Sequence, residues 1–175
     1  MTTSLASTNP AVHATGVLPT PATVVAVLDT NVVLDLLLFR DPRGQALHQA
    51  LSDQLLRWIT TEQMLVELDW VLHRSALAAW GHDSALVMAQ ARRLCSTVPA
   101  SAEGGSRVPR CTDPDDQMFI DLAWRWPAAL LFSRDRALLR LARPARLHGL
   151  WIGTPEQWPA PIWPEAQKRR PKPPF

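Results

Sequence analysis

Four acidic residues stand where a carboxylate could do chemistry, although they are scattered through the chain: Asp29, Glu67, Asp116 and Asp135. Asp29 directly follows the apolar run 24–28, and Asp135 follows the run 129–132 after two residues. Short apolar runs of this kind are typical of buried parallel strands, whose carboxyl ends form the binding edge of an open α/β sheet. Acids gathered at that edge repel one another unless a cation lies between them. The pattern therefore predicts a site for a divalent metal with oxygen ligands.

The elements that must position these acids alternate between strand and helix. We expect strands at 24–28, 56–59, 129–132 and 147–152, and helices at 31–38, 44–54, 61–72, 83–96, 113–126 and 134–141, with a loop at 101–110. Asp113 is the expected N-cap of the helix 113–126, with Pro114 at its first position. The alternation predicts a three-layer α/β/α fold with a mostly parallel central sheet of about four to five strands.

The two ends of the chain differ in composition from its middle. Residues 1–22 are mostly Thr, Ser, Ala and Pro, which predicts a disordered leader, and residues 161–175 form a basic, proline-rich tail. The single domain is expected to span 23–160. The longest apolar stretch, 32–39, is interrupted by Asp35, so no membrane span is expected. No signal peptide is evident, and the two cysteines have no metal-binding spacing, which favours a cytoplasmic protein.

Arginine carries most of the positive charge. Lys168 and Lys172 are the only lysines, whereas five arginines lie just around and beyond the fourth acid, at positions 134, 136, 140, 143 and 146. A guanidinium group binds phosphate through a planar fork, so arginines beside an acidic metal site suit a polyphosphate chain. We expect Arg134 and Arg136 to contact it. The alternative is that these are ordinary surface arginines.

The sequence around the four acids resembles the PIN domain family, the metal-dependent ribonuclease fold of many bacterial toxin–antitoxin toxins (VapC-like). The matching motifs are Leu28-Asp29-Thr30-Asn31-Val32, Leu65-Val66-Glu67-Leu68, Asp116 with Phe119, Ile120 and Ala123, and Ser133-Arg134-Asp135. Each motif alone is common, but four in order over about 24–158 are specific together. The segment Asp113-Pro114-Asp115-Asp116 further resembles the branch that contains toxin components. Ser133 departs from the more common Thr.

The resemblance implies a Mg²⁺- or Mn²⁺-dependent endoribonuclease that hydrolyses phosphodiester bonds of single-stranded RNA, as the toxin of a type II toxin–antitoxin pair. Asp29 and Asp116 would be the primary metal ligands, with Glu67 and Asp135 completing the catalytic set. The residues that would support them by hydrogen bonding are Thr30, Asn31, Asp113 and Ser133. The same resemblance implies a homodimer and a cognate antitoxin protein that blocks the acidic pocket.

Simpler explanations exist for individual acids. Asp29 could be no more than a helix N-cap, and Asp115 and Asp116 both favour a helix N-terminus electrostatically. Glu67 lies at the margin of an apolar stripe, where it could pair with Arg74. The five histidines form no ligand set.

Two other classes of protein compete with the nuclease. Phosphoryl-transfer domains of similar topology, such as response-regulator receivers and haloacid-dehalogenase-like phosphatases, depend on a lysine beside the acids. Both lysines of this chain lie in the tail, which argues against them. The non-enzymatic alternative is a catalytically inactive PIN-like module that binds RNA or protein, although the presence of all four acids argues against it.

Overall fold

The core of the molecule is a five-stranded, entirely parallel sheet. A computed structural model describes residues 23–74, 77, 81–100, 108–126 and 128–158. The strands are β1 (Val24–Leu28), β2 (Leu56–Thr60), β3 (Cys95–Thr97), β4 (Leu130–Phe132) and β5 (Trp151–Gly153), in the order β3-β2-β1-β4-β5. The predicted parallel α/β sheet is therefore confirmed. The expected leader and tail lie outside the described residues.

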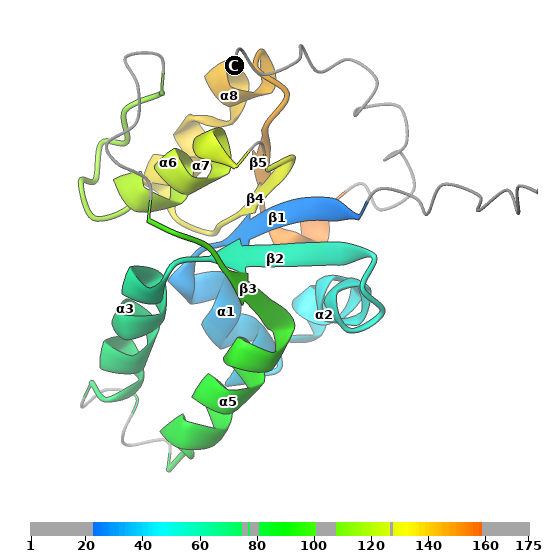
Figure 1. Cartoon of the computed structure of the whole chain (residues 1–175), viewed down its shortest axis with the longest axis vertical. Helices are drawn as coiled ribbons and strands as arrows, with labels where there is room; N and C mark the ends of the chain where they lie inside the picture. The colour runs from blue at the N-terminus through cyan, green and yellow to red at the C-terminus, as the bar shows by residue number, and fades with distance from the viewer. Residues whose placement is uncertain (1–22, 75–76, 78–80, 101–107, 127, 159–175) are drawn as a thin grey trace, which may run out of the picture.

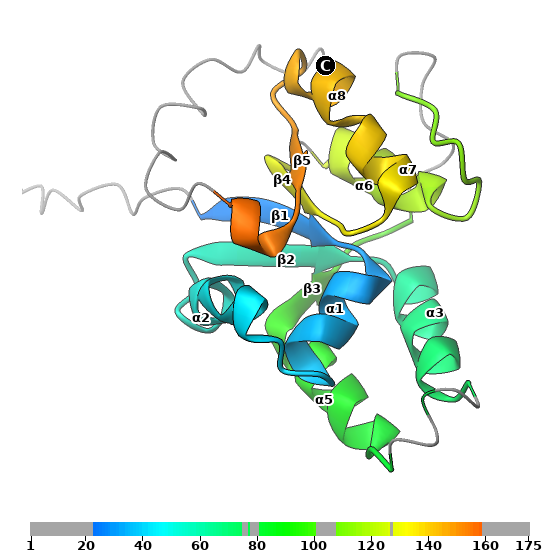
Figure 2. The same ribbon diagram turned by 180° about the vertical axis from the view of Figure 1, so that it is seen from behind.

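Helices cover both faces of the sheet (Figure 1). On one face lie α1 (Thr30–Leu37), α2 (Gln45–Ser52), α3 (Glu62–Leu72) and α5 (Ser84–Leu94), and on the other lie α6 (Gln117–Arg125), α7 (Arg136–Arg140) and α8 (Ala142–Arg146). Two short 3-10 turns, η1 (Pro42–Gly44) and η2 (Pro155–Gln157), pack together on the α1–α2 side (Figure 2). None of the helices in the described part of the chain is long and apolar enough to cross a membrane.

Strand alternation divides the core into two apolar layers. In β1, Ala26 and Leu28 pack with α1, α2 and α5, whereas Val27 packs with α6 and β4 on the opposite face. All three side chains are buried. A strand buried on both faces must be apolar at every position, which is why the run 24–28 contains no charged or polar residue. This burial fixes where β1 ends, and with it the position of Asp29.

The strand order places a topological switch point between β1 and β4. From β1 the chain moves to β2 and then β3 on one side, and later returns to add β4 and β5 on the other side. The register pairs Leu28 with Phe132, so both strands end at the same level. Helices that begin beyond the ends of two such neighbouring strands diverge to opposite faces, which leaves a crevice where ligands of open α/β proteins bind.

Three predicted boundaries are wrong. The helix expected over 83–96 ends at Leu94, because Cys95–Thr97 pair with β2 as an edge strand. The helix expected from 113 begins at Gln117. The strand expected over 147–152 is confined to Trp151–Gly153, and it follows α8, which the sequence pattern did not indicate. In each case tertiary pairing or a turn overrides a weak local pattern.

Candidate active site

Asp29 is a buried carboxylate at the switch point. It follows β1, and its backbone N–H donates to the Phe132 carbonyl of β4 over 3.0 Å. Its Oδ1 accepts a 2.8 Å hydrogen bond from the Val32 N–H, so Asp29 is the N-cap of α1. Its Oδ2 accepts a short hydrogen bond from the Ser133 hydroxyl. The capping explanation is therefore true for one oxygen, while the other ties β1 to the turn after β4.

The turn from Ser133 to Asp135 continues this hydrogen-bond chain. The buried Ser133 hydroxyl accepts from the Asp135 N–H over 2.9 Å while it donates to Asp29. The Asp135 carboxylate in turn accepts from the Ala137 N–H and caps α7. A hydroxyl can donate one bond and accept others, so Ser133 is chemically suited to link two acids. The structure thus brings Asp29, Ser133 and Asp135 together, as the sequence predicted.

Glu67 approaches the same edge from α3. Thr61 caps that helix through the Met64 N–H at 3.3 Å, which places Glu67 in its second turn, just beyond β2. Glu67 Oε1 accepts a 2.9 Å hydrogen bond from the hydroxyl of Thr30, the residue next to Asp29. The alternative pairing with Arg74 is wrong.

Arg74 instead packs on its neighbour in the helix. Its guanidinium carbon lies 4.3 Å from the centre of the Trp70 ring. Glu67 is therefore oriented by Thr30 toward the Asp29 side of α3, and Thr30 has the supporting position that the motif implied.

Asp116 occupies the N-cap position of α6 but does not cap it with its side chain. Asp113 caps the preceding turn instead, since its Oδ1 accepts from the Asp115 N–H over 3.0 Å. The expectation that Asp113 and Pro114 begin the helix is therefore wrong. The Asp116 carboxylate makes no capping hydrogen bond and is therefore available to bind a ligand, which argues against a purely helix-capping role.

Gln117 is a residue of this region that the sequence reasoning missed. Its side chain accepts from the Cys111 N–H at 2.7 Å and donates to the Pro109 carbonyl at 3.2 Å and to Asp121 at 2.9 Å. These bonds fasten the incoming loop to α6 and thereby fix Asp116. A glutamine directly after the acidic turn carries no motif of its own, so no sequence signal marked it.

Burial and neighbouring charges raise the pKa values of three of the acids. Burial, followed by the charges of Asp135, Asp113 and Asp29, raises the pKa of Asp116 from 3.8 to about 7. Burial also raises the pKa of Asp29 to about 6, although hydrogen bonds from Ser133, Val32 and the Arg134 backbone oppose it. Burial raises the pKa of Glu67 as well. Groups with raised pKa values around one crevice are typical of functional sites.

The donor chemistry of the site fits a hard divalent cation. All four candidate ligands are carboxylates, and oxygen ligands are those that Mg²⁺ and Mn²⁺ prefer. As the side chains stand, no three His, Cys, Asp or Glu residues within the described ranges are grouped closely enough to hold a metal ion. No capping bond holds the Asp116 side chain, and its carboxylate lies within hydrogen-bonding reach of Asp135 and close enough to Asp29 to feel its charge.

The remaining predicted residues differ in position. Asn31 is exposed in the first turn of α1, and Arg136 is exposed as the first residue of α7, next to Asp135.

The position of Arg134 does not support the predicted contact of its side chain with RNA. Its side chain is only 21% exposed and turns away from the crevice toward three acids of the α1–α2 side.

Those three acids surround the Arg134 guanidinium. Nε donates to Asp35 of α1 in a short contact, Nη1 donates to Glu156 of η2 over 2.7 Å, and Nη2 lies 3.8 Å from Asp41. A planar guanidinium has five N–H donors in a fixed fork, so it can bind several carboxylates at once. Arg134 therefore joins α1, η1 and η2 to the turn that holds Ser133 and Asp135.

A comparison with known families identifies the family of this chain. The profile of the family described as PIN domain matches residues 25–137, more than half of the chain and a range that contains all four acids. The chain therefore belongs to the PIN domain family. PIN domains are generally nucleases, and those nucleases generally use divalent metals. The comparison with curated proteins returned no match.

The Arg134 cluster yields a stability prediction. Arg134→Met should lower the free energy of unfolding by about 2–4 kcal/mol, because it leaves three carboxylates without their shared cation in a partly buried place. Arg134→Lys should recover only part of this loss, since an ammonium cannot fork between several acids. Urea denaturation measures both variants. Arg136→Met is the matched control and should change little; equal effects at the two positions would contradict the structural role of Arg134.

The raised carboxylate pKa values yield a pH prediction for protein kept metal-free with a chelator. Asp29 and Asp116 bind protons more tightly when folded than when unfolded, so their stabilising contribution is complete below about pH 4 and is lost as the pH rises through about 6–7. Between about pH 4.5 and about pH 7.5, the free energy of unfolding of Asp116→Asn should fall less steeply than that of the wild type. Parallel pH profiles of the two proteins would show that folding does not raise the pKa of Asp116.

Proposed function

We propose that this protein is a Mg²⁺- or Mn²⁺-dependent endoribonuclease that hydrolyses single-stranded RNA. The observation that carries the proposal is the set of four carboxylates at the β1–β4 switch point, in a chain of a family whose members are generally nucleases. Burial first, and the charges of neighbouring acids second, raise the pKa values of two of these acids to about 6 and about 7. A divalent cation bound between the acids would favour their ionised forms.

Asp29, Asp116 and Asp135 would hold the metal, and Glu67 would hold it or position the attacking water. A bound Mg²⁺ or Mn²⁺ would lower the pKa of a water molecule and stabilise the charge that develops on the phosphate. The hydrogen bonds from Val32 and Ser133 hold Asp29 in one orientation, so the site does not need to reorganise around that ligand.

Hydrolysis needs a group that accepts the proton of the attacking water. The oxygen of water forms a bond to phosphorus while the bond from phosphorus to the leaving ribose oxygen breaks. Glu67 is suited to take the proton of the water, because its Oε1 alone is engaged by Thr30 and its pKa is raised. Because Asp116 would be ionised when it holds the metal, the leaving oxygen would take its proton from a water molecule.

Substrate binding would rest on exposed cations beside the crevice. Arg136, at the start of α7 and next to Asp135, is placed to contact a backbone phosphate. Phosphate contacts of this kind give affinity without sequence preference. Arg136 remains our proposed RNA contact after Arg134 is removed from that role.

We further propose that the protein is a cytoplasmic toxin of a type II toxin–antitoxin pair, that it forms a homodimer, and that a cognate antitoxin covers the acidic crevice. The segment 113–116, with its resemblance to the toxin branch, supports this assignment. Exposed apolar side chains support a protein partner: Val66 and Trp70 of α3 are 66% and 59% exposed and flank Glu67 in the sequence. Exposed apolar groups beside a site are typical of surfaces that another protein covers.

The nuclease proposal predicts that catalysis and binding separate. Asp116→Asn should reduce Mn²⁺-dependent cleavage of a labelled single-stranded RNA at least about a hundredfold, because a metal ligand is lost. RNA affinity should stay equal or increase, since one negative charge near the phosphates is removed. Gel analysis of cleavage and filter binding in chelator measure the two effects.

Asp69→Asn, an exposed change on α3 with the same loss of charge, is the control and should retain wild-type cleavage. Equal cleavage by the wild type and Asp116→Asn would mean that a contaminating nuclease is responsible. A wild-type protein that binds RNA in Mn²⁺ but never cuts it would instead identify an inactive RNA-binding PIN module.

A further inference from the structure

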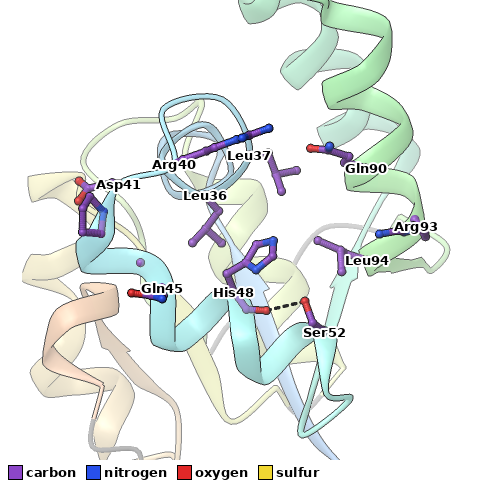
Figure 3. A pocket seen from close by; sticks show the side chains of 12 residues that line it. Leu36, Leu37, Arg40, Asp41, Gln45, His48, Ser52, Gln90, Arg93 and Leu94 are labelled. Carbon is purple, nitrogen blue, oxygen red and sulfur yellow. Dashed lines mark hydrogen bonds between the residues drawn. The ribbon is translucent and has the colours of Figure 1, made fainter.

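Two hollows of the described chain are lined by none of the four carboxylates. A cavity of about 550 Å³ lies between the end of α1, η1 and α2 on one side and the last turns of α5 on the other (Figure 3). A second hollow of about 750 Å³ adjoins it and shares Ser52, Arg93 and Leu94. The second one opens at Val25, Leu56 and Cys95, where strands β1, β2 and β3 begin. Both therefore lie at the end of the sheet opposite to the acidic crevice.

The first cavity combines an apolar wall with polar groups. Leu36 and Leu37 of α1 and Leu94 of α5 supply the apolar surface. Gln90 and Arg40 point toward each other across the opening, and His48 of α2 projects between the two walls (Figure 3). A volume of this size suits a small organic ligand, and such sites typically join an apolar surface to a few polar groups.

The charge of the cavity is positive. Arg40 and Arg93 line it from opposite walls, and neither makes an ion pair with any residue of the described ranges. The acid in its lining, Asp41, is already bound by Arg43 through hydrogen bonds of 2.7, 3.0 and 3.1 Å. Two guanidinium groups facing a hollow without a free acid are suited to an anion, and most of all to a phosphate.

Arg40 has an unusual backbone for its residue type. It follows the end of α1 with φ of 50°, in the left-handed region that favours glycine. A side chain at this position costs conformational energy that glycine would avoid. The Arg40 side chain lies at the opening of the cavity (Figure 3).

We propose that this cavity binds a nucleoside monophosphate, with the phosphate between Arg40 and Arg93 and the base against the leucine wall. The base is a flat, largely apolar body with hydrogen-bonding edges, which matches the leucines together with the amide of Gln90. The 5′-phosphate matches the two unpaired arginines. This proposal does not rest on the nuclease function, because it uses none of the four carboxylates.

Calorimetric titration of the full chain with adenosine 5′-monophosphate tests the proposal, in a buffer with chelator so that no metal recruits phosphate to the acids. We expect saturable binding with a Kd below about 1 mM, and weaker binding of both adenosine and inorganic phosphate. Arg40→Gly and Arg93→Gln should each weaken binding about tenfold, the effect of one lost charge-assisted contact.

Arg40→Gly carries its own folding control, since glycine suits the left-handed backbone and should leave the melting temperature unchanged or higher. Arg125→Gln, at the exposed end of α6, removes the same charge away from the cavity and should bind like the wild type. Asp116→Asn should also bind like the wild type, which separates this site from the proposed nuclease centre.

Three results would overturn the proposal. Absence of binding at several times the expected Kd would exclude the site. Equal affinity for adenosine and for adenosine 5′-monophosphate would show that Arg40 and Arg93 do not bind the phosphate. Affinity that falls equally in Arg40→Gly, Arg93→Gln and Arg125→Gln would show only a response to net charge.

Discussion

The hydrogen bond from Ser133 to Asp29 is the contact on which the arrangement of the crevice depends. It joins the end of β1 to the turn after β4, residues 104 positions apart in the sequence. Asp29 is 2% exposed, and a carboxylate that is removed from water must receive hydrogen bonds to remain ionised. Val32, Ser133 and the Arg134 backbone provide them, and the same bonds fix the start of α1, the turn after β4 and the capping residue of α7. The carboxylate is thus a structural element of the switch point as well as its proposed metal ligand.

Charge is distributed unevenly around this frame. The acids at the carboxyl ends of the strands raise one another's pKa values, and the nearest guanidinium, that of Arg134, is committed to Asp35, Asp41 and Glu156 on the other side of the turn. Arg134 therefore stabilises the fold without neutralising the crevice, which keeps the crevice attractive to a cation. The opposite end of the sheet has the reverse character, with Arg40 and Arg93 facing a cavity that holds no free acid. The two ends are suited to ligands of opposite charge.

Sequence reasoning succeeded where burial controls the pattern. The apolar runs of β1 and β4 predict strands buried on both faces, and Asp29 and Asp135 are recognisable because they follow those runs. It failed where a long-range contact decides the outcome. Cys95–Thr97 has no apolar run, and it becomes a strand only because β2 offers it an edge. In the sequence Arg134 has the appearance of a free arginine that could bind phosphate. Its three acidic partners are 99, 93 and 22 positions away, so no local pattern reveals them. Gln117 fixes Asp116 through bonds to a loop, and no local spacing could show this.

The central claim is that the carboxylates of the β1–β4 crevice bind one common divalent cation. It is tested most directly by titrating the metal-free protein with Mn²⁺ and measuring free Mn²⁺ by electron paramagnetic resonance. We expect saturable binding by the wild type and by Asp69→Asn, and binding at least about tenfold weaker in both Asp29→Asn and Asp116→Asn. The loss should appear in both variants because the two acids come from different elements and meet only at this site. Free Mn²⁺ that rises in proportion to added Mn²⁺ in the wild type, or equal affinity in all four proteins, would contradict the account.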